Sequence, residues 1–256
     1  MTGLRLVEID DAFSCYSPAN GNPVLSEAVL IYDEIFRRDT YLGGLGPINP
    51  RVVVDAGANI GLFTLFVKQR FPAAAVLAVE PAPQNVAALR ANLALHGVSG
   101  VAVHAGGLSD REGDARFFYF PAMPGNSTVH LDGKLADKRT VATYAGPEVA
   151  EQVYRHEECA VAMRPLSAVL RGSAHAEGDI DLLKVDVEGS EEAVLAGVSD
   201  ADWRRIRHVV LEVHTAGGAL DRVADLLRER GFAVELQDAA AAPKGTGTRM
   251  VYARRG

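Results

Sequence analysis

The sequence predicts an α/β fold, a doubly wound and mostly parallel sheet of seven strands with helices on both faces. From position 51 onward, short runs rich in β-branched residues alternate with helical patterns, which is typical of a parallel sheet covered by helices. The first run, VVVDAGANIGLFT (52–64), passes from strand to helix through a glycine turn. The 256 residues, 48% hydrophobic and 23% charged, have the size and composition of one domain with a large core.

Seven segments have the length and composition of buried strands. They are residues 51–55, 75–80, 101–105, 180–186, 208–213, 232–237 and 249–253. Helical patterns lie between them. Residues 83–96 and 218–230 each carry apolar side chains three or four positions apart, and a glycine, Gly97 or Gly231, follows each. Because connections between parallel strands are right-handed, these elements predict helices on both faces of the sheet.

The first 50 residues precede this sheet. They hold one helix-like stretch, residues 26–36, and we interpret them as an N-terminal helical cap or lid. No internal repeat or low-complexity linker marks a domain boundary in the sequence. We therefore expect a single domain over residues 1–256, with 1–50 as the cap and 51–256 as the α/β core.

An insertion at 111–170 follows the third strand. It contains RFFYF (116–120), which predicts a strand, then the turn-rich MPGNST (123–128) and a polar helical stretch. Connections of this length inside a compact α/β domain are usually functional or mobile. We therefore expect the insertion to contribute to a binding site.

Charge and composition exclude several classes of function. The formal net charge is −7, and Lys and Arg form only short pairs such as Arg204-Arg205, so nucleic-acid binding is not expected. Cys15 and Cys159 lie in no metal-ligand spacing, and the acidic N-terminus does not resemble a signal peptide, so we expect a reduced, cytoplasmic protein. No apolar run approaches the roughly 18 residues of a spanning helix, so no membrane insertion is expected.

The glycine turn after the first strand of the sheet is a candidate ligand site. In open α/β sheets, ligands lie outside the carboxyl ends of the strands, usually beginning at this turn. Gly57 and Gly61 lack Cβ atoms, which permits unusual backbone angles and close approach of a ligand. Glycines in such turns also occur for packing reasons alone.

Glu80 strengthens the ligand interpretation. It ends the second strand, nineteen residues after Gly61, where a carboxylate can accept hydrogen bonds from both hydroxyls of a ribose. The alternative is an acid that caps the helix after Pro81. The position of Glu80 at the end of the second strand therefore favours a nucleoside as the ligand.

The turn does not fit a dinucleotide. DAGANIG (55–61) has alanine where the dinucleotide fingerprint has its first and middle glycines, and Asp55 would repel a diphosphate. A cofactor with a cationic sulfonium, an amino-acid tail and no phosphate suits Asp55 better. S-adenosylmethionine is such a cofactor.

GGLSD (106–110) follows the third strand, where an adenine ring would lie. Small residues leave room for a flat base, Leu108 could cover one face, and Ser109 or nearby backbone amides could bind its edge. An ordinary turn would look similar.

Several segments together resemble the FkbM-type methyltransferases. They are DAGANIGLFT, VEPAPQN, GGLSD, MPGNST, LLKVDVEGSEEAVLAGV (182–198) and VVLEVH (209–214). The resemblance covers most of the chain. It implies the Rossmann-like fold of class I methyltransferases, and O-methylation of small molecules such as sugars and polyketides in secondary metabolism. It also implies an acceptor above the fourth and fifth strands, with S-adenosylmethionine bound at Asp55, Gly57, Asn59, Gly61 and Glu80.

Methyl transfer to a hydroxyl benefits from a general base. Alignment of the acceptor oxygen, the methyl carbon and the sulfur supplies part of the rate, and a base adds roughly 10²- to 10⁴-fold in typical cases. Asp186 and Glu188 follow the fourth strand, and Glu212 and His214 end the fifth. We predict His214 as the base because its unperturbed pKa of about 6.5 suits proton abstraction near neutrality.

Three neighbours of His214 have other expected roles. In a strand, Glu212 and His214 lie on the same face, so Glu212 is the alternative base. Asp186 is expected to bind the cofactor amine or to orient the acceptor hydroxyl. Lys184 is expected to pair with one of these acids rather than to transfer protons.

Four residues are candidate acceptor contacts: Tyr41, Asn126, Ser127 and Glu188. Each has an ordinary alternative. An isolated aromatic residue such as Tyr41 is often simply packed, and Asn126 and Ser127 are common turn residues. Glu188, before Gly189, could cap the helix that follows.

A divalent metal ion is an alternative way to activate the acceptor. Asp186, Glu212 and His214 could hold such an ion, which would lower the pKa of a hydroxyl. Only two carboxylates are offered, so a metal is not favoured and no metal site is predicted.

The sequence thus favours an S-adenosylmethionine-dependent O-methyltransferase that acts on a small hydroxylated molecule. Alternatives are an N-methyltransferase of a small metabolite, a dehydrogenase on the same fold, and a non-catalytic nucleoside-binding domain. The acceptor and the oligomeric state are not predicted.

Overall fold

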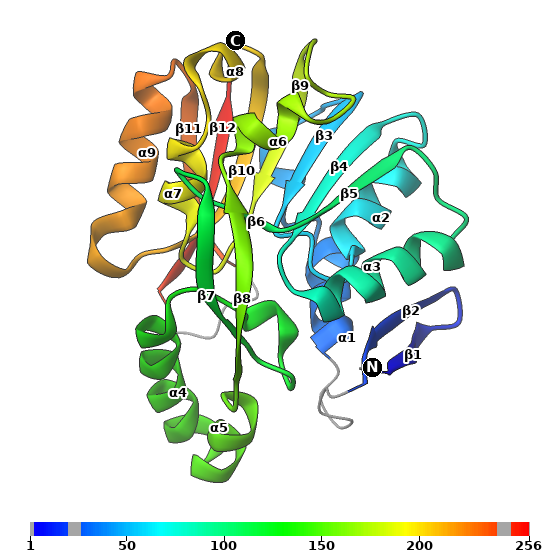
Figure 1. The fold of residues 1–256 in the computed structure, drawn as a ribbon, viewed down its shortest axis with the longest axis vertical. Coiled ribbons are helices and arrows are strands. Elements are labelled where there is room, and N and C mark those ends of the chain that lie inside the picture. The colour runs from blue at the N-terminus through cyan, green and yellow to red at the C-terminus, as the bar shows by residue number, and fades with distance from the viewer. Residues whose placement is uncertain (1–2, 20–26, 240–246, 256) are drawn as a thin grey trace.

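Seven strands form the central sheet of the structure, a computed structural model that describes residues 3–19, 27–239 and 247–255. Their order is β11-β12-β10-β9-β3-β4-β5 (Figure 1). The strands are β3 (Val52–Ala56), β4 (Ala75–Glu80), β5 (Val101–Ala105), β9 (Ile180–Val185), β10 (Ile206–His214), β11 (Ala233–Asp238) and β12 (Thr248–Arg254). All seven predicted strands are confirmed, each end within two residues of its predicted position.

The sheet is mostly parallel, as predicted. β3 pairs in parallel with β4 on one side and β9 on the other, and only β12 runs antiparallel to its neighbours β10 and β11 among these strands. The chain moves outward from β3 to β5 and then returns to β9, so the order reverses beside β3. The carboxyl ends of β3 and β9 therefore border the crevice where ligands of such sheets bind.

Successive residues of each strand face opposite layers of helices. Val53 belongs to the core beneath α2 (Leu62–Arg70) and α3 (Pro83–Leu95), whereas Val54 belongs to the core on the other face. That second layer is made of α6 (Leu166–Arg171), α7 (Glu191–Ala196), α8 (Asp200–Trp203) and α9 (Ala219–Glu229). The predicted helices 83–96 and 218–230 correspond to α3 and α9.

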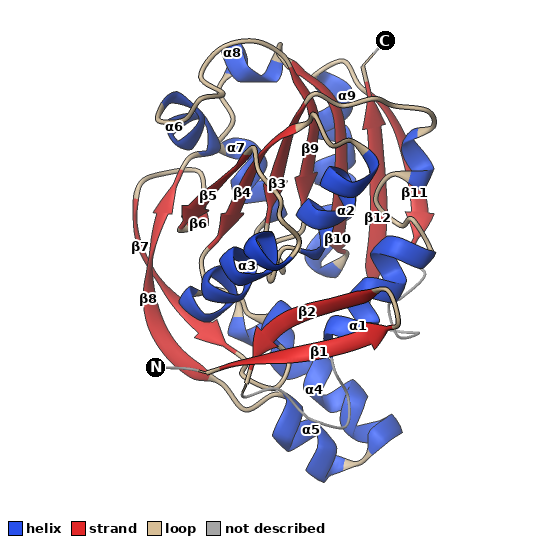
Figure 2. Cartoon of the chain, turned by 90° about the vertical axis from the view of Figure 1, so that its right-hand side faces the viewer, coloured by secondary structure: helices blue, strands red, loops and turns tan. Residues whose placement is uncertain are grey.

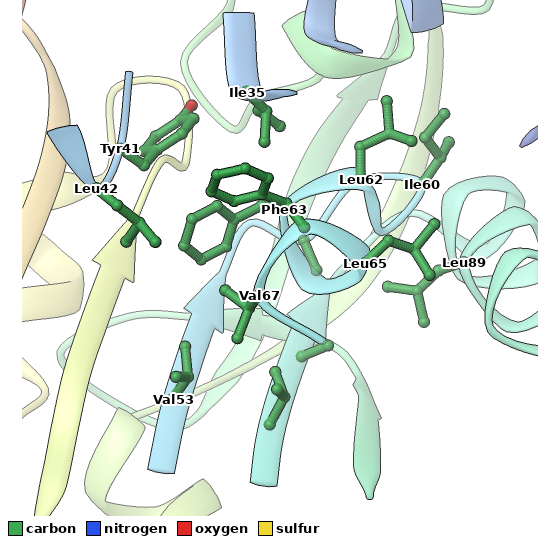
Figure 3. Close-up of a cluster of buried hydrophobic side chains, with 14 of the residues drawn as sticks. Ile35, Tyr41, Leu42, Val53, Ile60, Leu62, Phe63, Leu65, Val67 and Leu89 are labelled. Carbon is green, nitrogen blue, oxygen red and sulfur yellow. The ribbon is translucent and has the colours of Figure 1, made fainter. Parts of the chain in front are cut away.

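The N-terminal segment packs on the first layer. It contains α1 (Glu27–Tyr32), the π-helix η1 (Asp33–Arg37) and the 3-10 helix η2 (Gly43–Leu45). Figure 3 shows Ile35 and Tyr41 beside Phe63 of α2, and the rings of Tyr41 and Phe63 have centroids 5.2 Å apart. This apolar contact holds the segment over the sheet. Of the helix predicted at 26–36, Ser26 lies outside the described residues.

The N-terminal segment also contains a β-hairpin that the sequence analysis did not predict. β1 (Leu4–Asp10) and β2 (Phe13–Pro18) lie beside α3 (Figure 2), where the backbone amide of Tyr16 donates to Asn92 and the side chain of Asn92 donates back to the Tyr16 carbonyl. The inward positions of β2 include Cys15 and Ser17, so the alternation is not strongly apolar. The hairpin depends on contact with α3.

The insertion forms a second, three-stranded sheet of order β6-β8-β7. β7 (Gly113–Tyr119) and β8 (Glu157–Arg164) pair as a long ribbon, and β6 (Gly107–Leu108) joins it beside β4. The hairpin of α4 (Leu131–Ala145) and α5 (Pro147–Val153) lies at the far end of the ribbon (Figure 1). The strand predicted at RFFYF is confirmed as part of β7. Its partner β8 was not predicted.

No helix in the described part of the chain has the length and apolar character needed to cross a bilayer.

Candidate active site

A cavity of about 690 Å³ lies at the carboxyl ends of β3, β4, β9 and β10, and its volume is within the range of small-molecule sites. The turn after β3 and the end of β4 line one part of it. The ends of β9 and β10 line another. α1, η1 and the α4–α5 hairpin supply the remaining walls. The cavity therefore depends on the N-terminal segment and on the insertion as well as on the sheet.

The turn between β3 and α2 lies very close to the end of β9. A Cβ atom at Gly57 would lie 1.7 Å from the backbone oxygen of Asp186, and Gly57 has a φ of 81°. Both facts require glycine there. Gly61 instead faces Leu89 of α3, whose Cγ would lie 3.1 Å from an added Cβ, and it is not among the residues that line the cavity. Gly61 is therefore a packing glycine, while Gly57 lines the cavity.

The carboxylate of Glu80 is held at the end of β4 by three donors. Oε2 accepts from the backbone amide of Asn59 at 2.9 Å, and Oε1 accepts from the amide of Ala82 at 2.9 Å and from Nδ2 of Asn85 at 3.2 Å. Burial raises the pKa of Glu80 to about 7 although these hydrogen bonds act in the opposite direction. Asn59 adopts a φ of 49°, an uncommon conformation that is often found at functional sites.

The residues around Glu80 fit an adenosine group. Asn59 and Asn85 line the cavity, and each has a buried side-chain oxygen with no partner among the described residues, so each can accept a hydrogen bond from a ligand. Leu108, Phe117 and Met163 supply apolar walls nearby. Ser109, predicted to bind the adenine edge, is not among the lining residues; its hydroxyl donates to Asp110 at 3.1 Å.

Asp55 lies beneath the cavity rather than in it. It is 0% exposed, accepts from Thr64 Oγ1 at 2.7 Å, and lies 3.2 Å from the ammonium of Lys184. Lys184 lines the cavity, donates to the backbone oxygen of Gly57 at 2.7 Å and lies 3.6 Å from Asp186. Burial alone would lower the pKa of Lys184, but Asp55 and Asp186 raise it. Asp55 therefore acts on the site through Lys184, which pairs with acids as predicted.

A group of acids gathers where β9, β10 and η1 meet. Tyr41 donates to Oδ2 of Asp186 at 2.8 Å, and Asp186 and Glu212 both line the cavity. Burial raises the pKa of Asp186, and burial together with the Asp186 charge raises the pKa of Glu212 well above its usual range. Burial and Asp186 also raise the pKa of Glu34, from η1, to about 7.

Glu188 joins the insertion to the sheet. Its carboxylate lies 3.2 Å from Nε2 of His214 and accepts from Lys134 of α4, and its backbone oxygen accepts from Thr128 Oγ1 at 2.7 Å. Glu188 adopts a φ of 55°, so its backbone is strained. Burial acts to raise the pKa of Glu188, but Lys134 and His214 lower it to about 2. Glu188 is therefore an ionised carboxylate.

His214, predicted as the general base, lies in a strongly charged environment rather than in that of a free imidazole. Burial alone would lower its pKa, but the carboxylate of Glu188, 3.2 Å from Nε2, and the nearby charge of Glu191, whose Oε1 lies 3.7 Å from Nδ1, raise it to about 11. The imidazole is therefore a cation at neutral pH. A protonated imidazole donates hydrogen bonds and accepts no proton.

The other two predicted acceptor contacts lie before α4, Asn126 at the end of the 3-10 helix η3 (Pro124–Asn126) and Ser127 directly after it. Asn126 accepts from Lys134 at 3.3 Å, and the hydroxyl of Ser127 accepts from the backbone amide of Phe120 at 3.1 Å. Both line the cavity. Within the described ranges, no group of three or more His, Cys, Asp or Glu side chains is arranged to hold a metal ion.

Comparison with known proteins identifies the chain. A profile described as the methyltransferase FkbM domain matches residues 55–234, which is more than half of the sequence. The chain belongs to the FkbM methyltransferase family. It is an enzyme of the S-adenosylmethionine-dependent methyltransferases, and the resemblance seen in the sequence is confirmed.

Two relatives and one solved structure illustrate the similarity. The FkbM-family chain is 43% identical over 243 residues to 31-O-demethyl-FK506 methyltransferase FkbM of Streptomyces tacrolimicus, with 90% of each chain covered. It is 40% identical over 238 residues to methyltransferase sdnD of Sordaria araneosa, again with 90% of each covered. The crystal structure of methyltransferase FkbM from Methylobacillus flagellatus KT has a TM-score of 0.54 at 16% identity, over 82% of this chain and 45% of that one, and shows the shared fold.

Several residues of this FkbM-family site were not predicted from the sequence. Glu27, Glu34, Asn85 and Lys134 line the cavity but do not follow a strand of the sheet. The segment VEPAPQN contains Asn85 and was part of the resemblance, which is the only signal for it. The other three come from the N-terminal segment and the insertion, whose packing over the sheet was not predictable.

Glu27 should make this FkbM-family enzyme less stable as the pH rises. Its Oε1 accepts from the Gly125 amide at 2.9 Å, and burial raises its pKa from 4.5 to about 8. Between these values the folded state retains a proton that the unfolded state releases, so the free energy of unfolding falls with rising pH. Relative to wild type, Glu27→Gln should gain about 1–2 kcal/mol between pH 5 and pH 8, since one pKa unit is worth about 1.4 kcal/mol and partial solvation reduces the shift.

Urea unfolding at pH 5, 6.5 and 8 measures this difference. Exposed Glu148 of α5 provides the control, and Glu148→Gln should follow the wild-type curve at every pH. Parallel curves for Glu27→Gln and wild type would contradict the expected titration.

Proposed function

We propose that this enzyme transfers the methyl group of S-adenosylmethionine to a hydroxyl of a small, largely apolar molecule. One observation carries the proposal. A single cavity connects the Glu80 end of the sheet with a group of acids at the ends of β9 and β10. Cofactor and acceptor can therefore meet inside one cavity.

The residues around the β3–α2 turn suit the cofactor. When bound, S-adenosylmethionine supplies an electrophilic methyl group on a positively charged sulfur. Glu80, Asn59 and Asn85 offer acceptors for its ribose, and Leu108 offers an apolar wall for its base. The acids beyond the turn favour a cation.

The walls of the acceptor part point to the class of substrate. Leu30 and Ile31 of α1 and Val141, Val149 and Val153 of the α4–α5 hairpin supply apolar surface. Leu30 remains 50% exposed, which indicates an apolar wall that a ligand can cover. Among described residues, eight Asp or Glu side chains line the cavity against three Lys or Arg side chains.

A carboxylate suits the role of general base better than His214. Glu34 lines the cavity, is partly buried, and has a pKa of about 7, near the value at which a base works best at neutral pH. Asp186 uses one oxygen for the Tyr41 hydroxyl and keeps the other to orient an acceptor hydroxyl. His214, as a cation, holds Glu188, and Glu212 completes the acidic wall.

The names of relatives favour oxygen over nitrogen as the acceptor atom. The relative from Streptomyces tacrolimicus, 43% identical, is named for methylation at an oxygen of FK506. An amine acceptor remains the second candidate, because the acidic walls would also attract an ammonium group.

Labelled methyl transfer tests the proposed function. The enzyme, with deuteromethyl S-adenosylmethionine, should label one compound in an extract of a host strain that lacks the gene, and NMR should place the label on oxygen. Glu80→Gln should weaken S-adenosylmethionine binding about 10- to 100-fold, since it removes a charged acceptor from the ribose site. Label on nitrogen would establish the amine alternative, and binding without transfer in any extract would indicate a non-catalytic domain.

A further inference from the structure

One face of the α4–α5 hairpin forms a continuous wall of the cavity. The lining residues of the hairpin are Lys134, Asp137, Val141 and Ala145 of α4 and Val149 and Val153 of α5. Within each helix they are three or four positions apart, so they lie on one helical face. An α-helix rises about 1.5 Å per residue, so Ala145 lies roughly 16 Å along α4 from Lys134.

The wall changes from charged to apolar along its length. Lys134 is 5% exposed and pairs with Glu188, whose carboxylate lies 3.2 Å from Nε2 of His214 at the end of β10. Asp137 lies next to Lys134, with 3.9 Å between Oδ2 and Nζ. Beyond Asp137 the lining side chains of the hairpin are apolar apart from the hydroxyl of Tyr154. The charged end of the wall is therefore the end that adjoins the sheet.

The apolar part of the wall is open to a ligand. Val149 of α5 is 42% exposed, and Leu30 of α1, which lines the same cavity, is 50% exposed. Single exposed apolar residues are common, but exposed apolar residues that share a cavity indicate surface that a ligand covers. Ala145, the last residue of α4, is exposed and carries the smallest side chain of the wall. The outer end of the wall is therefore unobstructed.

We propose that the methyl acceptor is an elongated molecule that lays an apolar body along the α4–α5 hairpin, and that the small side chain of Ala145 allows this body to be long. This inference rests on the proposed function and specifies its acceptor. The hydroxyl end would lie among the carboxylates of Asp186 and Glu212, which can accept its hydrogen bonds. The opposite orientation would bury those carboxylates against apolar groups, which is costly.

A series of straight-chain primary alcohols, from butanol to dodecanol, tests this orientation. Their binding is measured by displacement of the fluorescent probe N-phenyl-1-naphthylamine, with S-adenosylhomocysteine present to fill the cofactor part of the cavity. The affinity of wild type should rise about fourfold for each added methylene group that is buried. The rise should end at the alcohol that extends beyond the wall.

Two variants shorten the wall to different extents. In Ala145→Trp, the rise in affinity should end at a shorter alcohol than in wild type, because the indole closes the outer end. In Val141→Phe it should end at a shorter alcohol still, because Val141 lies one turn closer to Lys134. If Val141→Phe does not fold, as judged by circular dichroism, Val141→Leu provides the same comparison with a smaller change.

Ala136→Trp is the matched control. Ala136 is an exposed alanine of the same helix that does not line the cavity. The control variant carries the same added indole and should follow wild type for every alcohol.

Three results would overturn the inference. Wild-type affinity that does not rise with alcohol length would mean that the cavity holds no elongated apolar body. Identical behaviour of Ala145→Trp and Ala136→Trp would mean that the end of α4 does not limit the acceptor. A limit in the Val141 variant no shorter than that of Ala145→Trp would mean that the body does not follow α4. The proposed function would survive all three results, whereas failure of wild type to bind S-adenosylmethionine in calorimetry would overturn both.

Discussion

Replacement of Lys184 by methionine should lower the free energy of unfolding by about 3–5 kcal/mol, the usual cost of removing one partner of a buried ion pair. Lys184 is 3% exposed and Asp55 is 0% exposed, with Nζ and Oδ1 3.2 Å apart. Without the ammonium, Asp55 would remain charged in an apolar interior or take up a proton. The Gly57 carbonyl would also lose its donor. Urea unfolding at pH 7, followed by circular dichroism, measures the loss.

Two further variants show whether the ion pair causes this effect. In Lys184→Met/Asp55→Asn the isolated charge is gone, so the double variant should be more stable than Lys184→Met. Lys138 pairs with Glu151 on the surface of the α4–α5 hairpin, and Lys138→Met should change stability by less than about 1 kcal/mol. A Lys184→Met protein as stable as Lys138→Met would refute the proposed role of the pair.

The sheet was predictable because its strands carry their own local signal. Val52–Ala56 and Ile180–Val185 are short, β-branched or aliphatic runs between turn residues, and parallel strands buried on both faces need such runs. The hairpin β1–β2 carries no such signal, because its inward positions include Ser17. Its strands are stabilised by α3, which is a tertiary contact.

The site was predictable only where it follows from the sheet. Glu80, Asp186, Glu212 and His214 were found because the carboxyl ends of parallel strands meet at one edge. The positive charge of His214 was not predictable, because it depends on Glu188. A left-handed backbone conformation places the Glu188 carboxylate beside the imidazole.

The walls of the cavity were the least predictable part. Glu34 and Lys134 come from segments whose packing over the sheet has no periodic signal. Asp55 was predicted to face the cofactor because it precedes the glycine turn, but its side chain points into the interior toward Thr64 and Lys184. The position of Asp55 along the strand predicts where the residue lies, but not which side chains it contacts.

Gly57→Ala should be the most damaging small substitution in the site. The added Cβ would lie 1.7 Å from the backbone oxygen of Asp186, so β9 and the β3–α2 turn would have to separate. The positive φ of 81° adds strain of about 1–2 kcal/mol, and overpacking of a rigid core adds about 1–3 kcal/mol. We expect a loss of about 3 kcal/mol or more in the free energy of unfolding, measured in urea, and no S-adenosylmethionine binding detectable by calorimetry.

Gly97→Ala separates the contact from the backbone strain. Gly97 also has a positive φ, 60°, but an added Cβ would meet nothing within 4 Å. Its replacement should therefore cost only the strain, about 1–2 kcal/mol, and leave cofactor binding unchanged. The difference in the free energy of unfolding between the two variants measures the cost of the steric contact between the β3–α2 turn and the end of β9. If both variants lose equal stability, the positive φ alone explains why Gly57 is needed. The turn would then accommodate a Cβ atom without a clash with Asp186, contrary to the 1.7 Å contact.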